Sequence, residues 1–169
     1  RWFWGGASLN KLLDSGKIDF KMASMEKEHP AAILFTSGST GPAKGVLFSH
    51  GIFNHQVRIL QEQFDIQPDE TDLPTFPLFG LFSSGLGMTS IIPDMDSTKP
   101  AYVDPKNIIV PIQNFKISSS FGSPALWDTV SQYCLDQNIQ LPTLKRIIMA
   151  GGPCSGNLLA RFETIIDKN

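Results

Sequence analysis

The sequence predicts an α/β fold: a layered, largely parallel, doubly wound sheet with helices on both faces. The first reason is that short apolar runs alternate along the chain with segments whose apolar residues recur at helical spacing. The second is a Gly-rich turn at residues 150–153 between a predicted strand and a predicted helix, the place where open α/β sheets bind ligands. The length of 169 residues, with 41% apolar and 18% charged residues, suits about one globular domain.

In the first half of the chain, two apolar runs flank a Gly-rich loop, so that this loop joins strand to strand. Apolar residues at helical spacing follow, and Ser49 can cap the start of that helix. The elements expected here are strands at 31–35 and 45–48, a helix at 51–64, a strand at 72–79 and a helix at 82–90.

In the second half, Asp104 and Pro105 form a cap and first-turn signal for a helix that Pro111 should kink or weaken. The elements expected here are a short strand at 90–92, the helix after 105, a strand at 116–121, a helix at 124–137, a strand at 145–150 and a last helix at 158–165.

Residues 14–30 are polar, mixed in charge and close with His29-Pro30, which marks the one candidate boundary. We expect residues 1–30 to be a surface segment and residues 31–169 to form the core. The chain starts at Arg1 with no charged-then-apolar leader, which favours an internal piece of a longer cytoplasmic polypeptide.

Composition also narrows the expected partners. The net charge is −2 and no Lys/Arg-rich run occurs, which argues against nucleic acid or an anionic membrane surface. No apolar stretch approaches the roughly 18 residues of a membrane span, so we expect no transmembrane segment. Cys134 and Cys154 lie far apart and imply no metal site; we expect both thiols to be buried and inert.

The most informative segment is 35–45, Phe-Thr-Ser-Gly-Ser-Thr-Gly-Pro-Ala-Lys-Gly. Its glycines let the backbone approach a ligand, its hydroxyls donate hydrogen bonds, and its lysine supplies a positive charge. These residues are Thr36, Ser37, Gly38, Ser39, Thr40, Gly41, Lys44 and Gly45. The composition favours a phosphate-binding loop over the alternative of a mobile hairpin loop.

The loop is not of the Walker type, because Ala43 and Gly45 stand where that pattern needs Gly and Ser/Thr. It resembles the signature of the adenylate-forming, or AMP-binding, superfamily: aromatic-Thr-Ser-Gly-Ser/Thr-Thr-Gly-x-Pro-Lys-Gly. The departure is Pro42-Ala43, where the family usually ends in Pro before Lys. Further runs at 72–79, 87–96, 121–126 and 141–146 resemble the β-lactone synthetases of bacterial long-chain olefin biosynthesis. The chain looks like part of the large N-terminal domain of such an enzyme.

The resemblance implies ATP-dependent activation of a fatty, 3-hydroxy carboxylic acid as an acyl-adenylate, with release of pyrophosphate, followed by β-lactone formation. Fatty-acyl-CoA or fatty-acyl-AMP ligase activity is the alternative, and a non-catalytic nucleotide-binding fragment is the second. It implies ATP and Mg²⁺ as cofactors and enzymes of the same lipid pathway as partners. Lys44 and Thr40 are the implied catalytic residues. The chain stops before the family's acidic Mg²⁺-binding segment and C-terminal lysine, so we expect it to be inactive alone.

Two further sites follow from the resemblance. Gly151, Gly152 and Pro153 match the segment that lines adenine in the family, although an ordinary strand-to-helix turn is the alternative. Phe79 and Gly80 match the substrate site, where many acyl-CoA ligases have His in place of Gly80. Four apolar residues are equally consistent with an acyl tunnel and with plain core: Phe76, Phe79, Leu81 and Phe82. For the pair Asp94 and Asp96, a solvated turn is favoured over a metal site, and we expect no residue of this chain to bind a metal.

Overall fold

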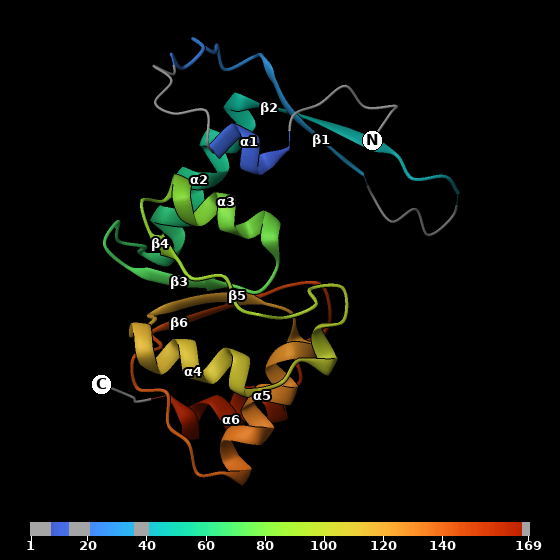
Figure 1. Cartoon of the computed structure of the whole chain (residues 1–169). Coiled ribbons are helices and arrows are strands. Elements are labelled where there is room, and N and C mark those ends of the chain that lie inside the picture. Colours follow the sequence, from blue (N-terminus) through green and yellow to red (C-terminus); the bar gives the residue numbers. More distant parts are fainter. Residues whose placement is uncertain (1–7, 14–20, 36–40, 167–169) are drawn as a thin grey trace. The chain divides into compact units, whose positions relative to one another are not determined.

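The computed structural model describes residues 8–13, 21–35 and 41–166 (Figure 1). The chain divides into two compact units, Arg1–Ile52 and Phe53–Asn169. The aromatic start at Arg1–Trp4 and the loop segment 36–40 lie outside the described residues. The assignment of residues 1–30 and 31–169 to a surface segment and a core stays a prediction.

The first unit contains a hairpin that leads into a helix. Strands β1 (Pro30–Phe35) and β2 (Gly45–Ser49) pair antiparallel, with Leu34 opposite Val46. The Gly-rich loop therefore joins strand to strand, as predicted. Helix α2 (His50–Phe64) begins directly after β2 and continues into the second unit; the short helix α1 (Leu9–Leu13) precedes the hairpin. The Ser49 Oγ accepts a hydrogen bond from the Ile52 N–H at 3.3 Å, which confirms the predicted cap.

The second unit is built on a four-stranded parallel sheet. Its strands are β3 (Thr71–Pro74), β4 (Thr89–Ser90), β5 (Ser119–Gly122) and β6 (Arg146–Met149), in the spatial order β4-β3-β5-β6. Figure 1 shows helix α3 (Pro77–Gly85) on one face and α4 (Lys106–Phe115), α5 (Pro124–Asp136) and α6 (Gly156–Ile165) on the other. The predicted α/β fold with a parallel sheet and helices on both faces is confirmed.

Side-chain caps explain where the helices after β5 and β6 begin. The Ser123 Oγ accepts from the Leu126 N–H, and the Ser155 Oγ accepts from the Leu158 N–H, each at 3.2 Å. The Asp104 carboxylate accepts from the Lys106 N–H at 3.0 Å just before α4. Pro111 lies inside α4, as expected, and a single 3-10 turn (Pro100–Tyr102) precedes this helix.

The region after β3 differs from the sequence prediction. A strand was expected over 72–79 and a helix over 82–90, but β3 ends at Pro74 and α3 already starts at Pro77. Pro77 at the first helical turn needs no backbone partner and has the φ of a helix, so it starts α3 there. The apolar run after it was assigned to a strand because periodicity does not separate a short buried helix from a strand.

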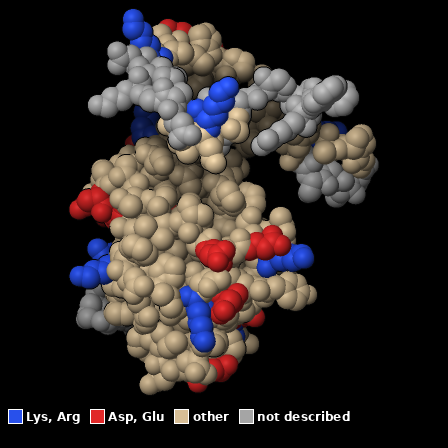
Figure 2. All heavy atoms as spheres, in the orientation of Figure 1, with Lys and Arg blue, Asp and Glu red and all other residues tan. Residues whose placement is uncertain are grey.

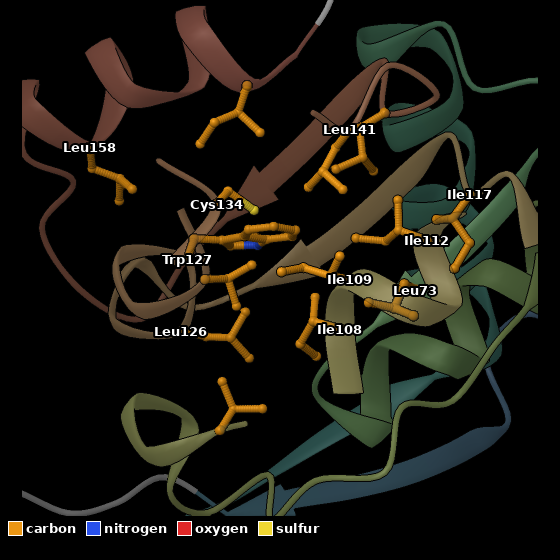
Figure 3. Close-up of a cluster of buried hydrophobic side chains, with 14 residues drawn as sticks. Leu73, Ile108, Ile109, Ile112, Ile117, Leu126, Trp127, Cys134, Leu141 and Leu158 are labelled. Atoms are coloured by element: carbon orange, nitrogen blue, oxygen red, sulfur yellow. The ribbon is translucent and has the colours of Figure 1, made fainter. Parts of the chain in front are cut away.

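The main core lies between the sheet and helices α4, α5 and α6 (Figure 3). Trp127 is fully buried at its centre, and its ring contacts Phe162 edge-on with centroids 5.6 Å apart. Burial raises the pKa of the Cys134 thiol to about 11, which keeps it protonated and unreactive. Cys154 is exposed, so the expectation that both thiols are buried is wrong for this residue. It follows the glycine turn, where the backbone leaves the sheet.

An ion pair lies at the edge of the sheet where the strands begin. The Arg146 guanidinium contacts both carboxylate oxygens of Glu70, at 2.9 and 3.2 Å, and the two side chains are only 15% and 9% exposed. The same guanidinium donates to the carbonyls of Phe64 and Asp65 at the end of α2. Arg146 therefore ties β6 to the start of β3 and to the end of α2.

Gly122 is packed too tightly to accept a side chain. A Cβ there would lie 2.8 Å from the Trp127 Nε1 and 2.9 Å from the Thr75 Oγ1. Both neighbours are buried, and the Thr75 hydroxyl already donates to the Phe121 carbonyl. We expect Gly122→Ala to lower the free energy of unfolding by about 2 kcal/mol through overpacking.

Urea unfolding of the intact protein measures this effect. Gly156→Ala is the matched control, because a Cβ at Gly156 meets nothing within 4 Å. A loss below about 0.5 kcal/mol in Gly122→Ala, the range of an ordinary surface substitution, would contradict the close packing.

Candidate functional site

A hollow of about 290 Å³ lies at the carboxyl ends of β5 and β6, between the first turns of α5 and α6. It is lined by Ser123, Pro124, Ala125, Asp128, Gly151, Gly152, Pro153, Ser155 and Leu158. The predicted adenine-contacting residues 151–153 thus lie together in one wall. The hollow stands where ligands bind in open α/β sheets.

The glycine turn leaves this hollow open to a flat ligand. Gly151 has φ of 89°, a conformation that favours glycine, and a Cβ at Gly151 or Gly152 would meet nothing within 4 Å. The space beside the backbone is therefore free on the side where a side chain would stand.

Asp128 is a charged residue in this wall that sequence reasoning missed. Its carboxylate forms an ion pair with the Arg161 guanidinium on α6, which also donates to the Ser131 Oγ at 2.9 Å. The pair links α5 to α6 below the hollow. Ser123 and Ser155, the N-cap residues of α5 and α6, are the other polar residues of the wall and were also missed; a serine just before a helix is the signal that could have identified them.

A second cavity, of about 60 Å³, lies between α3 and the sheet, on the face opposite to α4, α5 and α6. Its lining is almost wholly apolar, with Phe79, Phe82, Leu86 and Met88 on one side and Phe121 and Ile148 on the other. The rings of Phe79 and Phe121 stack with centroids 3.5 Å apart and planes 16° from parallel. This stack stands at the carboxyl ends of the strands, because Phe121 is the third of the four residues of β5.

Of the two predicted substrate residues, Phe79 and Gly80, one lines the apolar cavity and the other does not. Phe79 lines the apolar cavity, but Gly80 does not: a Cβ at Gly80 would meet Ile92 and Pro74 at 3.6 Å. Phe82 shares the cavity with Phe79, whereas Phe76 and Leu81 are exposed. Of the four residues that suggested an acyl tunnel, two therefore face a cavity.

A buried carboxylate borders the same cavity and was not singled out in the sequence. Asp72 is 4% exposed and accepts a hydrogen bond of 2.5 Å from the Ser83 Oγ. Burial raises the pKa of the Asp72 carboxyl, and hydrogen bonds from Ser83 and Ser119 oppose that rise. A charged residue at the start of a buried apolar strand was the signal that could have identified it.

The phosphate-loop residues are described only in part. Thr36, Ser37, Gly38, Ser39 and Thr40 lie outside the described residues. Gly41 and Lys44 are exposed, and Gly45 opens β2 opposite Phe35. These residues belong to the first unit, and the hollow and the cavity belong to the second.

Charges and other candidate groups add little to the site. On the face that Figure 2 shows, acidic and basic side chains of the described residues are interspersed rather than gathered by sign. Asp96 accepts from the hydroxyl and the backbone N–H of Thr98, which confirms a solvent-facing turn. Across residues 8–13, 21–35 and 41–166, no three His, Cys, Asp or Glu side chains form a metal-binding group. No helix within these ranges is both long and apolar enough to cross a membrane.

A sequence profile described as AMP-binding enzyme matches residues 6–168. The chain belongs to this family. It is 40% identical over 167 residues to the olefin beta-lactone synthetase of Xanthomonas campestris pv. campestris and 42% identical over 164 residues to that of Stenotrophomonas maltophilia. These matches cover 98% and 96% of the chain but 29% of each relative, so the chain spans under a third of their length.

Solved structures of low sequence identity share the fold. The O-succinylbenzoate coenzyme A synthetase of Bacillus subtilis, in complex with AMP, matches with a TM-score of 0.73 and 18% identity over 91% of this chain and 39% of its own. The ATP-bound MatB of Rhodopseudomonas palustris matches with a TM-score of 0.74 and 20% identity over 96% of this chain and 32% of its own. The chain therefore adopts part of the adenylate-forming fold.

Proposed function

We propose that this chain is part of an enzyme that activates a fatty, 3-hydroxy carboxylic acid with ATP and then closes it to a β-lactone. The observation that carries the proposal is the 40% identity to an olefin beta-lactone synthetase over 98% of the chain. The matched span includes the phosphate loop, the glycine turn and the strand that bears Phe121. A cytoplasmic location and cooperation with other enzymes of the same lipid pathway belong to this proposal.

In the first step, a carboxylate oxygen of the acid attacks the α-phosphorus of ATP, and pyrophosphate leaves. In the second, the 3-hydroxyl oxygen attacks the carbonyl carbon of the acyl-adenylate, loses its proton, and AMP leaves. The second step forms a four-membered ring within one molecule and needs no thiol acceptor. Thiol attack at the same carbon would instead give an acyl thioester.

The nucleotide is held, in this proposal, by two segments. The backbone and hydroxyls of residues 36–41, with Lys44 and Gly45, bind the phosphates and stabilise the charge on the leaving pyrophosphate. Lys44 and Thr40 are the residues assigned to catalysis. Gly151, Gly152 and Pro153 contact adenine, and the open space beside the two glycines supports that assignment.

Magnesium is the expected counter-ion of the phosphates, since metal ions neutralise developing charge in phosphoryl transfer. The described residues offer no cluster of ligands to hold it. None of the described residues is therefore assigned to the metal.

The alkyl part of the acid enters, we propose, the apolar cavity beneath α3. The lining of the cavity extends from the Phe79–Phe121 stack, near the carboxyl edge of the sheet, to Asp72 and Ser119 near the starts of β3 and β5. In this proposal the alkyl chain enters from the carboxyl edge. Burial of each methylene contributes about 0.8 kcal/mol, so even a narrow apolar cavity favours a fatty acid over a small polar one.

The alternatives are a fatty-acyl-CoA or fatty-acyl-AMP ligase and a nucleotide-binding protein without catalysis. The medium-chain-fatty-acid–CoA ligase of Ectopseudomonas oleovorans is 20% identical over 91% of this chain, half the identity of the synthetases. Pyrophosphate release by the intact protein tests the proposal. Release that requires both ATP and a fatty acid is expected, and ATP binding without release would favour the non-catalytic alternative.

Gly80 offers a test of the lactone step. We propose that the missing side chain leaves room beside the reacting carboxylate, so Gly80→His should reduce lactone yield about 10-fold and reduce pyrophosphate release less. Gly80→Ala is the control, since its Cβ would make ordinary contacts of 3.6 Å with Ile92 and Pro74. Equal losses of lactone and pyrophosphate in Gly80→His would contradict this role.

A further inference from the structure

Asp72 and Ser83 form a buried polar pair beside an almost wholly apolar cavity. Asp72 is 4% exposed and Ser83 is 1% exposed. The pair joins two elements, because Asp72 lies on β3 and Ser83 lies on the last turns of α3. An apolar pair of similar volume would give as much stability or more, so stability alone does not explain a carboxylate here.

The direction of the strands places this pair at the far end of the cavity. Asp72 pairs with Ser119, near the starts of β3 and β5, and Phe121 stands two residues further along β5. At about 3.3 Å per residue, the pair and the Phe79–Phe121 stack are separated by about 7 Å along the sheet. An alkyl chain that passes the stack from the carboxyl edge therefore ends near Asp72 and Ser83.

The pair is also linked to the stack through α3. The Ser83 Oγ lies 3.2 Å from the Phe79 carbonyl oxygen as well as 2.5 Å from the Asp72 Oδ2. The Met88 N–H donates to the Ser83 carbonyl at 2.9 Å, and Met88 lines the cavity. Ser83 thus contacts β3, the turn of α3 that carries Phe79, and the segment that follows α3.

We propose that Ser83 and Asp72 are positioning residues that set the enzyme's selectivity for a long alkyl chain. Their hydrogen bond adds to those that Asp72 receives from Ser119 and the Leu73 backbone, and it holds α3 on β3, so that Phe79 stays stacked on Phe121. Neither residue takes part in the chemistry. The inference rests on the proposed function, because it assigns the cavity to the alkyl part of the acid.

Removal of the Ser83 hydroxyl should selectively weaken the binding of long-chain acids. Without the Ser83 donor, the buried Asp72 carboxylate keeps only its hydrogen bonds from Ser119 and the Leu73 backbone. It then favours water at this end of the cavity, which an alkyl terminus must displace. A short acid does not reach this end. Ser83→Ala is expected to raise the Kd of dodecanoate about 10-fold and that of hexanoate less than about 3-fold.

Isothermal titration of the intact protein with dodecanoate and hexanoate measures both constants. Ser84→Ala is the matched control: it makes the same change one residue along α3, at an exposed hydroxyl that contacts the Gly80 carbonyl at 3.2 Å. Asp72→Asn is expected to keep the preference for dodecanoate, since its amide oxygen still accepts from Ser83. Ser83→Cys, a weaker donor, should shift the preference in the same direction by less and replaces Ser83→Ala if that variant does not fold.

The outcomes separate this inference from the proposed function. Selective loss of dodecanoate binding supports the inference. Equal losses for both acids, or no difference from Ser84→Ala, would show a purely structural pair and overturn the inference while leaving the proposed function in place. If the wild-type protein binds neither acid, the inference and the proposed fatty substrate fail together.

Discussion

Replacing Arg146 with Gln is expected to lower the free energy of unfolding by about 3 kcal/mol, because removal of one partner leaves the other charge buried and unpaired. The Glu70 carboxylate, 9% exposed in its side chain, would lose both of its contacts with the guanidinium. The carbonyls of Phe64 and Asp65 would lose their donors as well. Urea unfolding of the intact protein measures the loss.

The control is Arg58→Gln, which breaks the exposed pair between Arg58 and Glu62, 3.7 Å apart on α2. Exposed pairs of this kind contribute about 0.3–0.5 kcal/mol, so the two Arg→Gln variants should differ widely. Similar losses in both would contradict the role assigned to Arg146.

The Glu70 pair also predicts a pH dependence. Burial on its own raises the pKa of the Glu70 carboxyl, but hydrogen bonds from Arg146, Gln67 and Ser118 and the Arg146 charge outweigh it, and the pKa is lowered from its ordinary 4.5. The folded protein therefore holds this proton less tightly than the unfolded chain, so the stabilisation is present above pH 4.5 and is lost as the pH falls below it. In Arg146→Gln, the free energy of unfolding should therefore fall less as the pH is lowered.

Replacing Lys44 with Ala is expected to lower the rate of pyrophosphate release about 100-fold, or roughly 2.7 kcal/mol of transition-state stabilisation. The proposed role of Lys44 is to stabilise charge on the leaving pyrophosphate, and this stabilisation is greatest in the transition state. Lys44 is exposed, so the fold should remain intact.

Single-turnover measurement of pyrophosphate release, with saturating ATP and dodecanoate, isolates this effect from product release. Lys145→Ala is the control, because Lys145 is also exposed and precedes β6 at the opposite end from the glycine turn. Lys44→Arg should restore part of the rate through its charge. A rate in Lys44→Ala within about 3-fold of wild type would rule out the proposed role.

The sequence was sufficient for the layered fold because its signals are local. Ser49, Ser123 and Ser155 cap helices by contacts with residues only three positions away. The exception is the run after Pro74, whose apolar residues carry no clear period. There Pro77 is a local start signal that the strand assignment overlooked, and the packing of α3 against the sheet is not contained in the local pattern.

The site was predictable only where a motif carries it. The loop at 35–45 was proposed from its glycines, hydroxyls and lysine, and the adenine role of the turn at 151–153 from the family resemblance. The Asp72–Ser83 bond joins residues eleven positions apart on a strand and a helix, and Asp128 meets Arg161 across two helices. Such pairs depend on the tertiary arrangement of the sheet and its helices, so no local pattern in the sequence signals them.

The most direct test of β-lactone formation is the mass of the product that the intact protein forms from ATP and a 3-hydroxy fatty acid, with and without CoA. We expect a product lighter than the acid by one water, formed without CoA, and no such product from the matched acid that lacks the 3-hydroxyl. An acyl-CoA thioester as the product would contradict β-lactone formation and assign the chain to an acyl-CoA ligase.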